Sequence, residues 1–271
     1  MLTSKTALSV SLVIPMFNEE ETIEHAIACG VSALELYGGD YEIILVDDAS
    51  TDGSPAIVQR LAAENPRIRV LSHAVNRKLG GALKTGFAAA TRDLVVYMDA
   101  DLPFDPQVIG PAIRALEVTR ADVIAGYRLD RTTEGLRRTI YSYLYNSLIG
   151  LLFGWPHRDI NFSFKLLRRE VLEAIELRSE GSLIDAELIV KAKNLGFVIQ
   201  QLGLDYFPRS RGVSTLSSAS VIWKMLRELI DLYPEMRHPR RRWQLPPVAE
   251  PEPPPSAAAT AGYAVTSRAG G

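Results

Sequence analysis

Residues 94–106 read Leu-Val-Val-Tyr-Met-Asp-Ala-Asp-Leu-Pro-Phe-Asp-Pro, an apolar run that ends in two closely spaced aspartates. The first five residues are apolar and β-prone, which predicts a strand of ordinary length. Asp99 and Asp101 follow at once, and Pro103 then breaks the strand and begins a loop. In open α/β sheets, ligands bind just outside the carboxyl ends of the strands. We therefore expect a binding site at the end of this strand.

Two carboxylates one residue apart at a strand end suit a hard divalent cation. Mg²⁺ and Mn²⁺ prefer oxygen ligands and keep open positions for substrate phosphates. Asp99 and Asp101 therefore predict a site that binds a metal ion and a phosphate group. The alternative is that this tripeptide is only a polar strand terminus, and the rest of the chain has to decide between the two.

Strand-like and helix-like segments alternate around this stretch. We predict strands over residues 10–14, 41–46, 68–71, 94–98, 122–125, 162–167 and 198–204. We predict helices over residues 18–29, 55–64, 82–90, 106–117, 140–155, 184–195 and 217–233, and loops over 76–81, 128–138 and 209–214. Asn18 is expected to cap the first of these helices. Alternation with short connections predicts an α/β fold with a mainly parallel sheet and helices on both faces.

Two common nucleotide-binding motifs are missing. Residues 81–86, Gly-Ala-Leu-Lys-Thr-Gly, have the glycine spacing of a phosphate loop, but Phe87 and Ala88 follow where Lys and Ser or Thr are required. No Gly-x-Gly-x-x-Gly follows the first strand either. The chain is therefore not expected to be a P-loop NTPase or a dinucleotide-dependent dehydrogenase.

The composition limits the classes of partner and the location that we expect for the protein. The 271 residues suffice for one large domain, and 32 acidic residues nearly balance 30 basic ones, so no nucleic-acid partner is expected. Cys29 is the one cysteine, which excludes an intrachain disulfide and points to a cytoplasmic location. No segment reaches the roughly 18–20 apolar residues of a membrane span.

Two predicted helices are candidates for contact with a membrane surface. Residues 140–155 are aliphatic with interleaved tyrosines, which fits either a buried or an interfacial helix. The helix over 217–233 is followed by Arg237, Arg240, Arg241 and Arg242. Such a run is solvated or holds the protein on an anionic membrane. We predict one domain over 1–236, with a basic segment and a disordered Pro/Ala-rich tail over 237–271.

Four motifs in a fixed order carry a family resemblance. They are Val-Ile-Pro-Met-Phe-Asn-Glu at 13–19, Val-Asp-Asp-Ala-Ser-Thr-Asp-Gly-Ser at 46–54, Gly-Gly-Ala-Leu-Lys-Thr-Gly-Phe at 80–87 and Asp-Ala-Asp at 99–101. Each is weak alone, but together they are specific. Over roughly residues 8–235 the chain resembles family 2 glycosyltransferases of GT-A fold, and most closely the branch that glycosylates dolichyl or other polyprenyl phosphates.

The resemblance implies a set of site residues. Asp99 and Asp101 match the positions that bind Mg²⁺ or Mn²⁺, and Asp101 is the stronger candidate. The positions expected to contact the nucleotide-sugar are Pro15, Phe17, Glu19, Asp47, Asp48, Lys84, Asp99, Ala100, Arg138 and Ser214. Asp48 and Asp52 also suit turn capping. The catalytic candidates are Asp101, Arg128, Asp185, Glu187 and Arg209, and Asp159 and Lys165 lie in further motifs of that branch.

The implied reaction is displacement at the anomeric carbon with inversion, from a nucleotide-sugar of GDP-mannose or UDP-glucose type. A polyprenyl phosphate acceptor is already ionised near neutral pH, because the second pKa of a phosphate monoester is about 6. A hydroxyl acceptor needs a general base, for which Asp185 and Glu187 are the candidates. The expected location is cytoplasmic, with peripheral contact at the inner face of the membrane.

The chain departs from the branch pattern in three places. Pro103 stands where relatives often have glutamine, Thr215 stands where many have lysine, and no carboxy-terminal membrane segment is expected. These departures leave two alternatives to polyprenyl phosphate transfer. One is the same donor chemistry on a hydroxyl acceptor, and the other is a non-catalytic protein that binds nucleotide-sugar or lipid phosphate.

Overall fold

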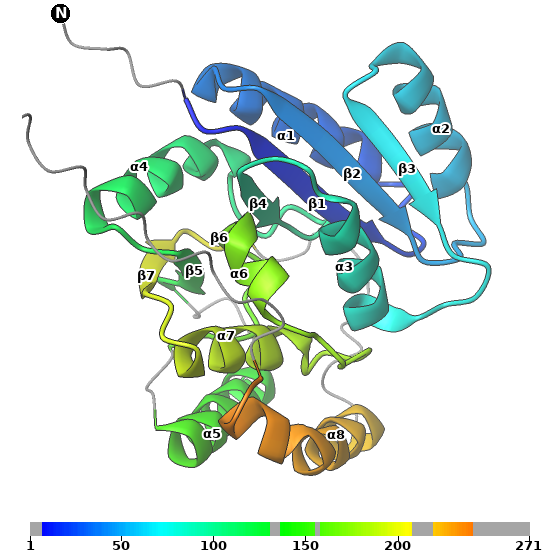
Figure 1. Ribbon diagram of the computed structural model, residues 1–271. Helices are drawn as coiled ribbons and strands as arrows, with labels where there is room; N and C mark the ends of the chain where they lie inside the picture. The colour runs from blue at the N-terminus through cyan, green and yellow to red at the C-terminus, as the bar shows by residue number, and fades with distance from the viewer. Residues whose placement is uncertain (1–6, 131–135, 155–157, 208–218, 241–271) are drawn as a thin grey trace, which may run out of the picture.

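The computed structural model describes residues 7–130, 136–154, 158–207 and 219–240, with the side chains of 136–138 and 219–222 outside that description. A seven-stranded sheet lies between two layers of helices (Figure 1). The strands are β1 (Val10–Met16), β2 (Tyr41–Asp47), β3 (Ile68–Ser72), β4 (Leu94–Tyr97), β5 (Val123–Arg128), β6 (Lys165–Arg168) and β7 (Ile199–Leu204). The helices are α1 (Ile23–Tyr37), α2 (Ser54–Glu64), α3 (Lys78–Ala89), η1 (Pro106–Val108), α4 (Ile109–Thr119), α5 (Leu136–Phe153), α6 (Arg169–Ala174), α7 (Ile184–Asn194) and α8 (Ala219–Arg237).

The sheet is mainly parallel, as the sequence predicted. Its strand order is β3-β2-β1-β4-β6-β5-β7. Only β6 runs against its neighbours, pairing antiparallel with β4 and with β5. The carboxyl ends of β1, β2, β3 and β4 therefore meet at one edge of the sheet.

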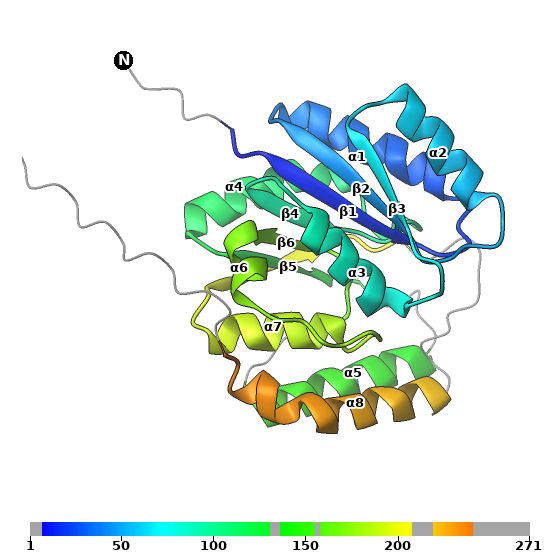
Figure 2. The ribbon, with the colours of Figure 1, turned by 45° about the vertical axis from the view of Figure 1, so that its right-hand side comes forward.

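The two faces of the sheet carry separate apolar clusters. Strand side chains alternate between faces, so that Leu12 and Ile14 of β1 pack with α1, α2 and α4. Val13 of β1 and Val95 of β4 instead pack with α3, α5, α7 and α8. Figure 2 shows the second layer below the sheet, with α7 next to the strands and α5 and α8 beyond it. Burial on both faces explains why these strands read as continuous apolar runs.

The first predicted helix differs in both of its boundaries. α1 begins at Ile23 instead of residue 18, and it continues through Gly30 to Tyr37. A Cβ at Gly30 would lie 2.8 Å from Leu12 Cδ2, so this glycine allows α1 to pack closely on β1 and does not end the helix. The residue that ends α1 is Gly38, whose φ of +80° is the left-handed conformation common after helices.

The prediction of a loop over 76–81 is wrong for its last four residues. α3 begins at Lys78, so both glycines at 80 and 81 lie inside the helix. A Cβ on Gly80 would lie 2.5 Å from the carbonyl oxygen of Ser179. The glycine signal therefore reports a close backbone approach between α3 and the 179–180 segment, and not a turn.

The middle of the chain also departs from the prediction. β5 extends through Arg128 and α5 begins at Leu136, so the predicted loop over 128–138 is shorter. β6 begins at Lys165 instead of residue 162, and the sequence did not predict the short helix α6. α8 continues through Pro234 to Arg237. Residues 241–271, for which a disordered tail was predicted, lie outside the described part of the chain.

Candidate active site

The first group of predicted site residues lies together at the edge where β1, β2 and β4 end. Pro15 lies buried in β1 beside Val46 of β2, and Met16 pairs with Asp47. Asp47 is buried, and its Oδ1 accepts a hydrogen bond from the backbone N–H of Ser50 at 3.0 Å. Phe17 is 46% exposed at the same edge. An exposed aromatic ring beside a buried carboxylate is a suitable place for a flat base.

The loops after β1 and β2 are joined by reciprocal hydrogen bonds. Asn18 donates its backbone N–H to Ser50 Oγ at 3.0 Å, and its Oδ1 accepts from the Thr51 backbone N–H at 2.8 Å. Glu20 Oε2 accepts from the backbone N–H of Gly53 at 2.6 Å. Asn18 was predicted to cap a helix, but its partners lie 32 and 33 residues away. The two loops therefore form one unit at the end of the sheet.

Asp52 completes the link between these loops. Its carboxylate accepts from the backbone N–H groups of Ser54 at 3.0 Å and Glu20 at 3.1 Å. Burial alone would raise the pKa of Asp52, but these hydrogen bonds outweigh it and lower the pKa overall. Glu19 donates its backbone N–H to Ser54 Oγ at 2.8 Å, and its Oε2 accepts from Thr22 Oγ1 at 2.8 Å. The hydrogen bond from the Ser54 backbone N–H to Asp52 confirms the predicted role of Asp52 as a turn cap.

Asp48 is held by residues after β3. Its Oδ1 lies 2.7 Å from His73 Nδ1 and accepts from the backbone N–H of Arg77 at 2.8 Å. His73 Nε2 in turn lies 2.9 Å from Thr85 Oγ1 on α3. Asp48 is 3% exposed. This geometry makes Asp48 a support for the β3–α3 connection, whereas Phe17 is the exposed side chain at this edge.

Asp99 and Asp101 lie just beyond the end of β4. Both are half-buried, whereas Met98 and Ala100 on either side of Asp99 are buried, with Ala100 2% exposed. Leu102 has a φ of 50° and its backbone N–H bonds to the carbonyl of Asp99 at 3.4 Å. The chain thus turns sharply at the two carboxylates.

The donor set at this turn fits Mg²⁺ or Mn²⁺. Among the residues that the structure describes, no three His, Cys, Asp or Glu side chains gather closely enough to hold a metal ion by themselves. Magnesium sites commonly use one or two carboxylates, with substrate phosphates and water as the other ligands. Asp99 and Asp101 would supply such a pair of carboxylates, and substrate phosphates would supply further ligands.

Backbone strain is concentrated at the same edge. Within the described ranges, five non-glycine residues have positive φ, and four of them follow β1, β2, β3 and β4 in turn. They are Asn18 (56°), Ala49 (64°), Lys78 (60°) and Leu102 (50°). Residues in sparsely populated conformations cluster at ligand sites, where the surrounding structure holds them. This distribution marks the edge independently of any motif.

Arg128 ends β5 on the other side of β4. Its Nη1 lies 3.2 Å from Asp159 Oδ2, and its guanidinium lies 4.8 Å from the ring centre of Tyr206 and 5.3 Å from that of Phe162. Its side chain is 10% exposed and that of Asp159 is 1% exposed. The pair fixes the guanidinium in one orientation, as a bidentate phosphate ligand requires.

Lys165 is a buried ammonium that joins three segments. Its Nζ lies 2.7 Å from Asp185 Oδ1 on α7 and 2.8 Å from the carbonyl of Ile160, and it also bonds to the carbonyl of Phe162 and the hydroxyl of Tyr97. Tyr97 donates a further hydrogen bond to Asp185. Burial first, and then the charge of Asp185, raise the pKa of Tyr97 well above its usual value. Asp185 is therefore occupied in holding the end of β4 and the 158–164 loop together.

Glu187 also has fixed partners. It is fully buried, and its carboxylate accepts from the backbone N–H groups of Arg178 and Ser179 at 2.8–3.0 Å. Lys191 Nζ lies 2.6 Å from its Oε1. A carboxylate in this setting holds the 178–179 segment against α7, and the geometry gives no support to its expected role as a general base.

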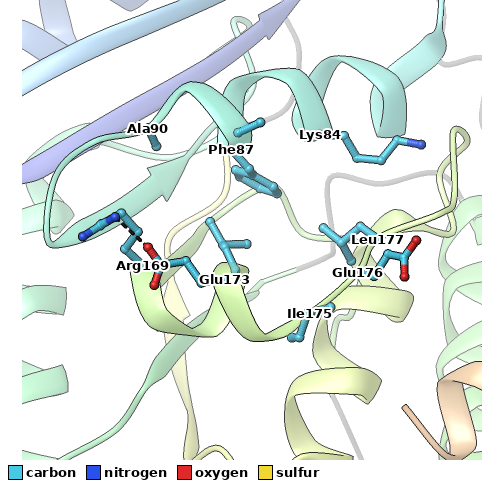
Figure 3. A pocket seen from close by; sticks show the side chains of 10 residues that line it. Lys84, Phe87, Ala90, Arg169, Glu173, Ile175, Glu176 and Leu177 are labelled. Atoms are coloured by element: carbon cyan, nitrogen blue, oxygen red, sulfur yellow. Dashed lines mark hydrogen bonds and ion pairs between the residues drawn. The ribbon is translucent and has the colours of Figure 1, made fainter. Parts of the chain in front are cut away.

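Lys84 is held by the segment that precedes α7. Its Nζ donates to the carbonyl of Arg178 at 3.1 Å and lies 3.7 Å from Glu180. It lies at the rim of a pocket of about 490 Å³ between α3 and α6 (Figure 3). The Arg169–Glu173 ion pair lies at the opposite end of that pocket. Because Arg169 follows the end of β6 that pairs with the start of β4, the Arg169 end of this pocket lies at the other end of the sheet from Asp99.

Three expected site residues cannot be placed. Arg209 and Ser214 lie outside the described residues, as does Thr215. The backbone of Arg138 lies in α5, but its side chain is outside the description.

Comparison with known proteins identifies the family. A family model described as Glycosyl transferase family 2 matches residues 11–176. The chain belongs to glycosyl transferase family 2. The matched region of this family 2 glycosyltransferase contains the joined loops after β1 and β2, the two aspartates after β4 and the Arg128–Asp159 pair.

Curated relatives include proteins whose names contain a polyprenyl phosphate. Glycosyltransferase AglD of Haloferax volcanii is 32% identical over 209 residues, 74% of this chain and 34% of that protein. The dolichol-phosphate mannosyltransferase of Pyrococcus furiosus is 31% identical over 231 residues, 83% of this chain and 64% of that protein. The dodecaprenyl-phosphate galacturonate synthase of Rhizobium johnstonii is 28% identical over 87% of this chain and 69% of that protein. The chain thus spans between about a third and about two thirds of the length of these relatives.

Solved structures confirm the GT-A fold. Glucosyl-3-phosphoglycerate synthase from Mycobacterium tuberculosis, crystallised with Mn²⁺, uridine diphosphate and glucosyl-3-phosphoglycerate, superposes with a TM-score of 0.63. It is 23% identical, and the match covers 85% of this chain and 80% of that one. The same synthase with Mg²⁺ and uridine diphosphate gives a TM-score of 0.62.

Sequence reasoning missed several residues that organise the site of this family 2 glycosyltransferase. It did not assign structural roles to His73, Tyr97 or Tyr206, and it noted Lys165 only as part of a motif. One signal was present, because a lysine in the middle of the apolar run 162–167 needs a buried partner. The partners themselves, Asp185 above all, are distant in sequence.

Proposed function

We propose that this family 2 glycosyltransferase transfers a hexose, with inversion, from a GDP-mannose-type or UDP-glucose-type donor to a polyprenyl phosphate, using Mg²⁺ or Mn²⁺. The observation that carries the proposal is the pair of half-buried carboxylates, Asp99 and Asp101, beside the joined loops after β1 and β2. The names of the curated relatives support the acceptor class. The metal-containing neighbours support the cofactor.

The donor is expected to lie across the ends of β1, β2 and β4. In this arrangement Phe17 and Asp47 contact the base, and Asp99 and Asp101 would hold the metal ion against the diphosphate. The metal would supply charge stabilisation for the departing nucleoside diphosphate. Carboxylates that are already in place would hold the metal ion without rearrangement during the reaction.

Arg128 is the proposed contact for a phosphate on the acceptor side. Asp159, Phe162 and Tyr206 hold its guanidinium in place. An ionised phosphate oxygen attacks without a general base. The polyprenyl phosphate acceptor therefore agrees with the fixed partners of Asp185 and Glu187, which leave neither carboxylate available as a base. A hydroxyl acceptor would need a base from outside this pair.

The test is a transfer assay with purified full-length protein. The reaction contains Mn²⁺ or Mg²⁺, radiolabelled GDP- and UDP-sugars in separate tubes, and a polyprenyl phosphate in detergent, and is followed by extraction into organic solvent. We expect label in the lipid phase, with at least a hundredfold loss in Asp101→Asn (on the order of removing one electrostatic group from an active site).

Asp105→Asn is the matched control. Asp105 is an exposed carboxylate four residues further along, whose Oδ1 accepts only a local bond from Gln107 N–H at 2.9 Å among the bonds described for it. This variant should keep its activity. Label in water-soluble product alone would move the acceptor to a hydroxyl compound, and absence of metal-dependent donor binding by calorimetry would contradict the enzymatic role.

A further inference from the structure

The two helices furthest from the sheet carry an unusual number of exposed apolar side chains. Of the fourteen large hydrophobic residues that are exposed in the described part of the chain, five lie on α5 and two on α8. They include Leu151 at 83% exposed, Trp223 at 71% and Ile230 at 73%. Exposed apolar patches of this kind mark interaction sites on proteins.

These residues form a stripe along the outer side of each helix. On α5, Ile140, Leu144 and Leu151 follow one another at intervals of four and seven residues, opposite the buried Ile149 and Phe153. The ring of Phe153 packs on Tyr233 of α8 with centroids 5.4 Å apart. The two helices are thus in contact through their inner sides, and we call their outer sides together the α5–α8 face.

α8 repeats this arrangement. Leu229 and Met236 are buried toward the domain, whereas Trp223 and Ile230 lie seven residues apart on the outer side. Arg227 is exposed between them on the same side of the helix. Both helices therefore carry apolar residues on their outer sides as well as on their inner sides.

The charges of the α5–α8 face have mainly one sign. The two glutamates of α8 turn toward the domain, where Glu228 accepts from the Glu180 backbone N–H and Glu235 pairs with Arg178 at 2.7 Å. The exposed charges of the described part of α8 and the residues after it are Lys224, Arg227, Arg237 and Arg240, against Asp231 alone. The sequence of α5 contains two arginines and no acidic residue.

The α5–α8 face adjoins the acceptor side of the site. Asn146 of α5 bonds to the backbone of Arg158 and Ile160, on either side of the Asp159 that pairs with Arg128, and α8 packs on α5. Both views show α5 and α8 side by side beyond α7 (Figures 1 and 2). A surface that these helices contact would lie on the same side of the domain as Arg128.

We propose that the α5–α8 face docks on an anionic lipid surface, with both helices lying along it. The apolar stripes would enter the boundary between headgroups and acyl chains, and the basic side chains would contact the headgroups. No helix of the described residues is long and apolar enough to cross a bilayer. A second copy of the chain fits this face less well, because a symmetric contact would bring Lys224 and Arg227 of one copy close to their counterparts.

The proposal extends the proposed function, because docking would bring Arg128 toward a membrane-borne acceptor phosphate. Docking itself needs neither sugar donor nor acceptor, so the two can fail separately. Transfer to a polyprenyl phosphate in detergent reports the chemistry, and binding to vesicles that lack polyprenyl phosphate reports the docking surface.

The experiment is flotation of the full chain with vesicles of phosphatidylcholine alone and of phosphatidylcholine mixed with phosphatidylglycerol. We expect binding to the mixed vesicles, and at least about tenfold weaker binding for Leu151→Glu/Ile230→Glu, since tenfold corresponds to about 1.4 kcal/mol. The matched control is Leu36→Glu/Val118→Glu, whose side chains are 73% and 84% exposed on α1 and α4, behind the opposite face of the sheet. The control should bind as the unaltered protein does.

Three outcomes would overturn the proposal. One is no binding of the unaltered protein to the mixed vesicles, and another is equal loss in both double variants. The third is a dimer in sedimentation velocity without lipid that Leu151→Glu/Ile230→Glu converts to a monomer, which would assign the face to a second copy. Detergent-phase transfer activity that survives Leu151→Glu/Ile230→Glu would show that the variant is folded.

Discussion

Replacing Lys165 with methionine should lower the free energy of unfolding by about 3–5 kcal/mol, the usual cost of removing one partner from a buried ion pair. Lys165 is fully buried and its Nζ lies 2.7 Å from Asp185 Oδ1. At that separation the attraction is about 6 kcal/mol for an effective dielectric constant of ~20. Most of it offsets the desolvation of the two charges, so the loss comes mainly from the carboxylate left without its partner.

A double-mutant cycle isolates that interaction. Asp185→Asn removes the other charge while keeping an oxygen for Tyr97 and Lys165. The double variant holds no buried charge at this position, so it should be more stable than the sum of the single losses predicts. We expect a coupling energy of about 2 kcal/mol, which is ordinary for residues in contact.

The assay is urea unfolding followed by circular dichroism, with linear extrapolation to water. Additive losses, with coupling below about 0.5 kcal/mol, would refute the view that Lys165 and Asp185 act as a pair. The control is Arg169→Met, because Arg169 forms an exposed ion pair with Glu173 and its loss should cost less than about 1 kcal/mol.

Three further changes test other parts of the structure by the same unfolding measurement. Burial raises the pKa of Glu42, but hydrogen bonds led by those from Thr91 lower it overall from 4.5. The stability that this group contributes is therefore present above pH 4.5 and is lost as the pH falls through the lower pKa of the folded state. Glu42→Gln should cost about 1–3 kcal/mol at neutral pH and should flatten the acid decline, and an unchanged slope below pH 4.5 would contradict this assignment. Ala49→Gly should add about 0.5–1 kcal/mol, because the φ of 64° strains alanine and not glycine, and a loss would show that the residue is unstrained. Gly86→Ala should cost about 1–3 kcal/mol, because its Cβ would lie 2.3 Å from Val13 Cγ1, and a neutral result would mean that α3 can move away from β1.

Local sequence patterns predicted most of the sheet. β2, β3 and β4 agree with their predicted ranges to within one residue at each end, because each is a short apolar run followed by polar residues. The direction of β6 was not predictable in the same way. Its sequence indicates a strand, but hydrogen bonds with β4 and β5, contributed by residues far along the chain, determine that it runs antiparallel.

The sequence indicated candidate site residues where neighbouring residues form a motif, but it could not indicate contacts between residues far apart in the chain. Asp99 and Asp101 are adjacent on one turn, so their spacing indicated a cation site, and the family to which the chain belongs was identified from motifs of the same kind. Asn18 was taken for a helix cap because its partner Thr51 cannot be recognised from the residues around it. Glu187 was a candidate base for a hydroxyl acceptor, and the sequence could not show that its carboxylate is buried.

Because β6 is antiparallel to β5, the chain between them is a long connection whose two ends are fixed at the same end of the sheet. β5 and β6 are paired neighbours, with Ala125 opposite Lys165, so everything between Arg128 and Lys165 leaves the sheet and returns to it at the same edge. The entropic cost of closing such a connection rises by only about 0.6 kcal/mol when its length doubles. The part of this connection before Arg158, including α5, can therefore change in length without reordering a strand. Such changes would leave the ends of β1, β2 and β4, and the joined loops after β1 and β2, as they are.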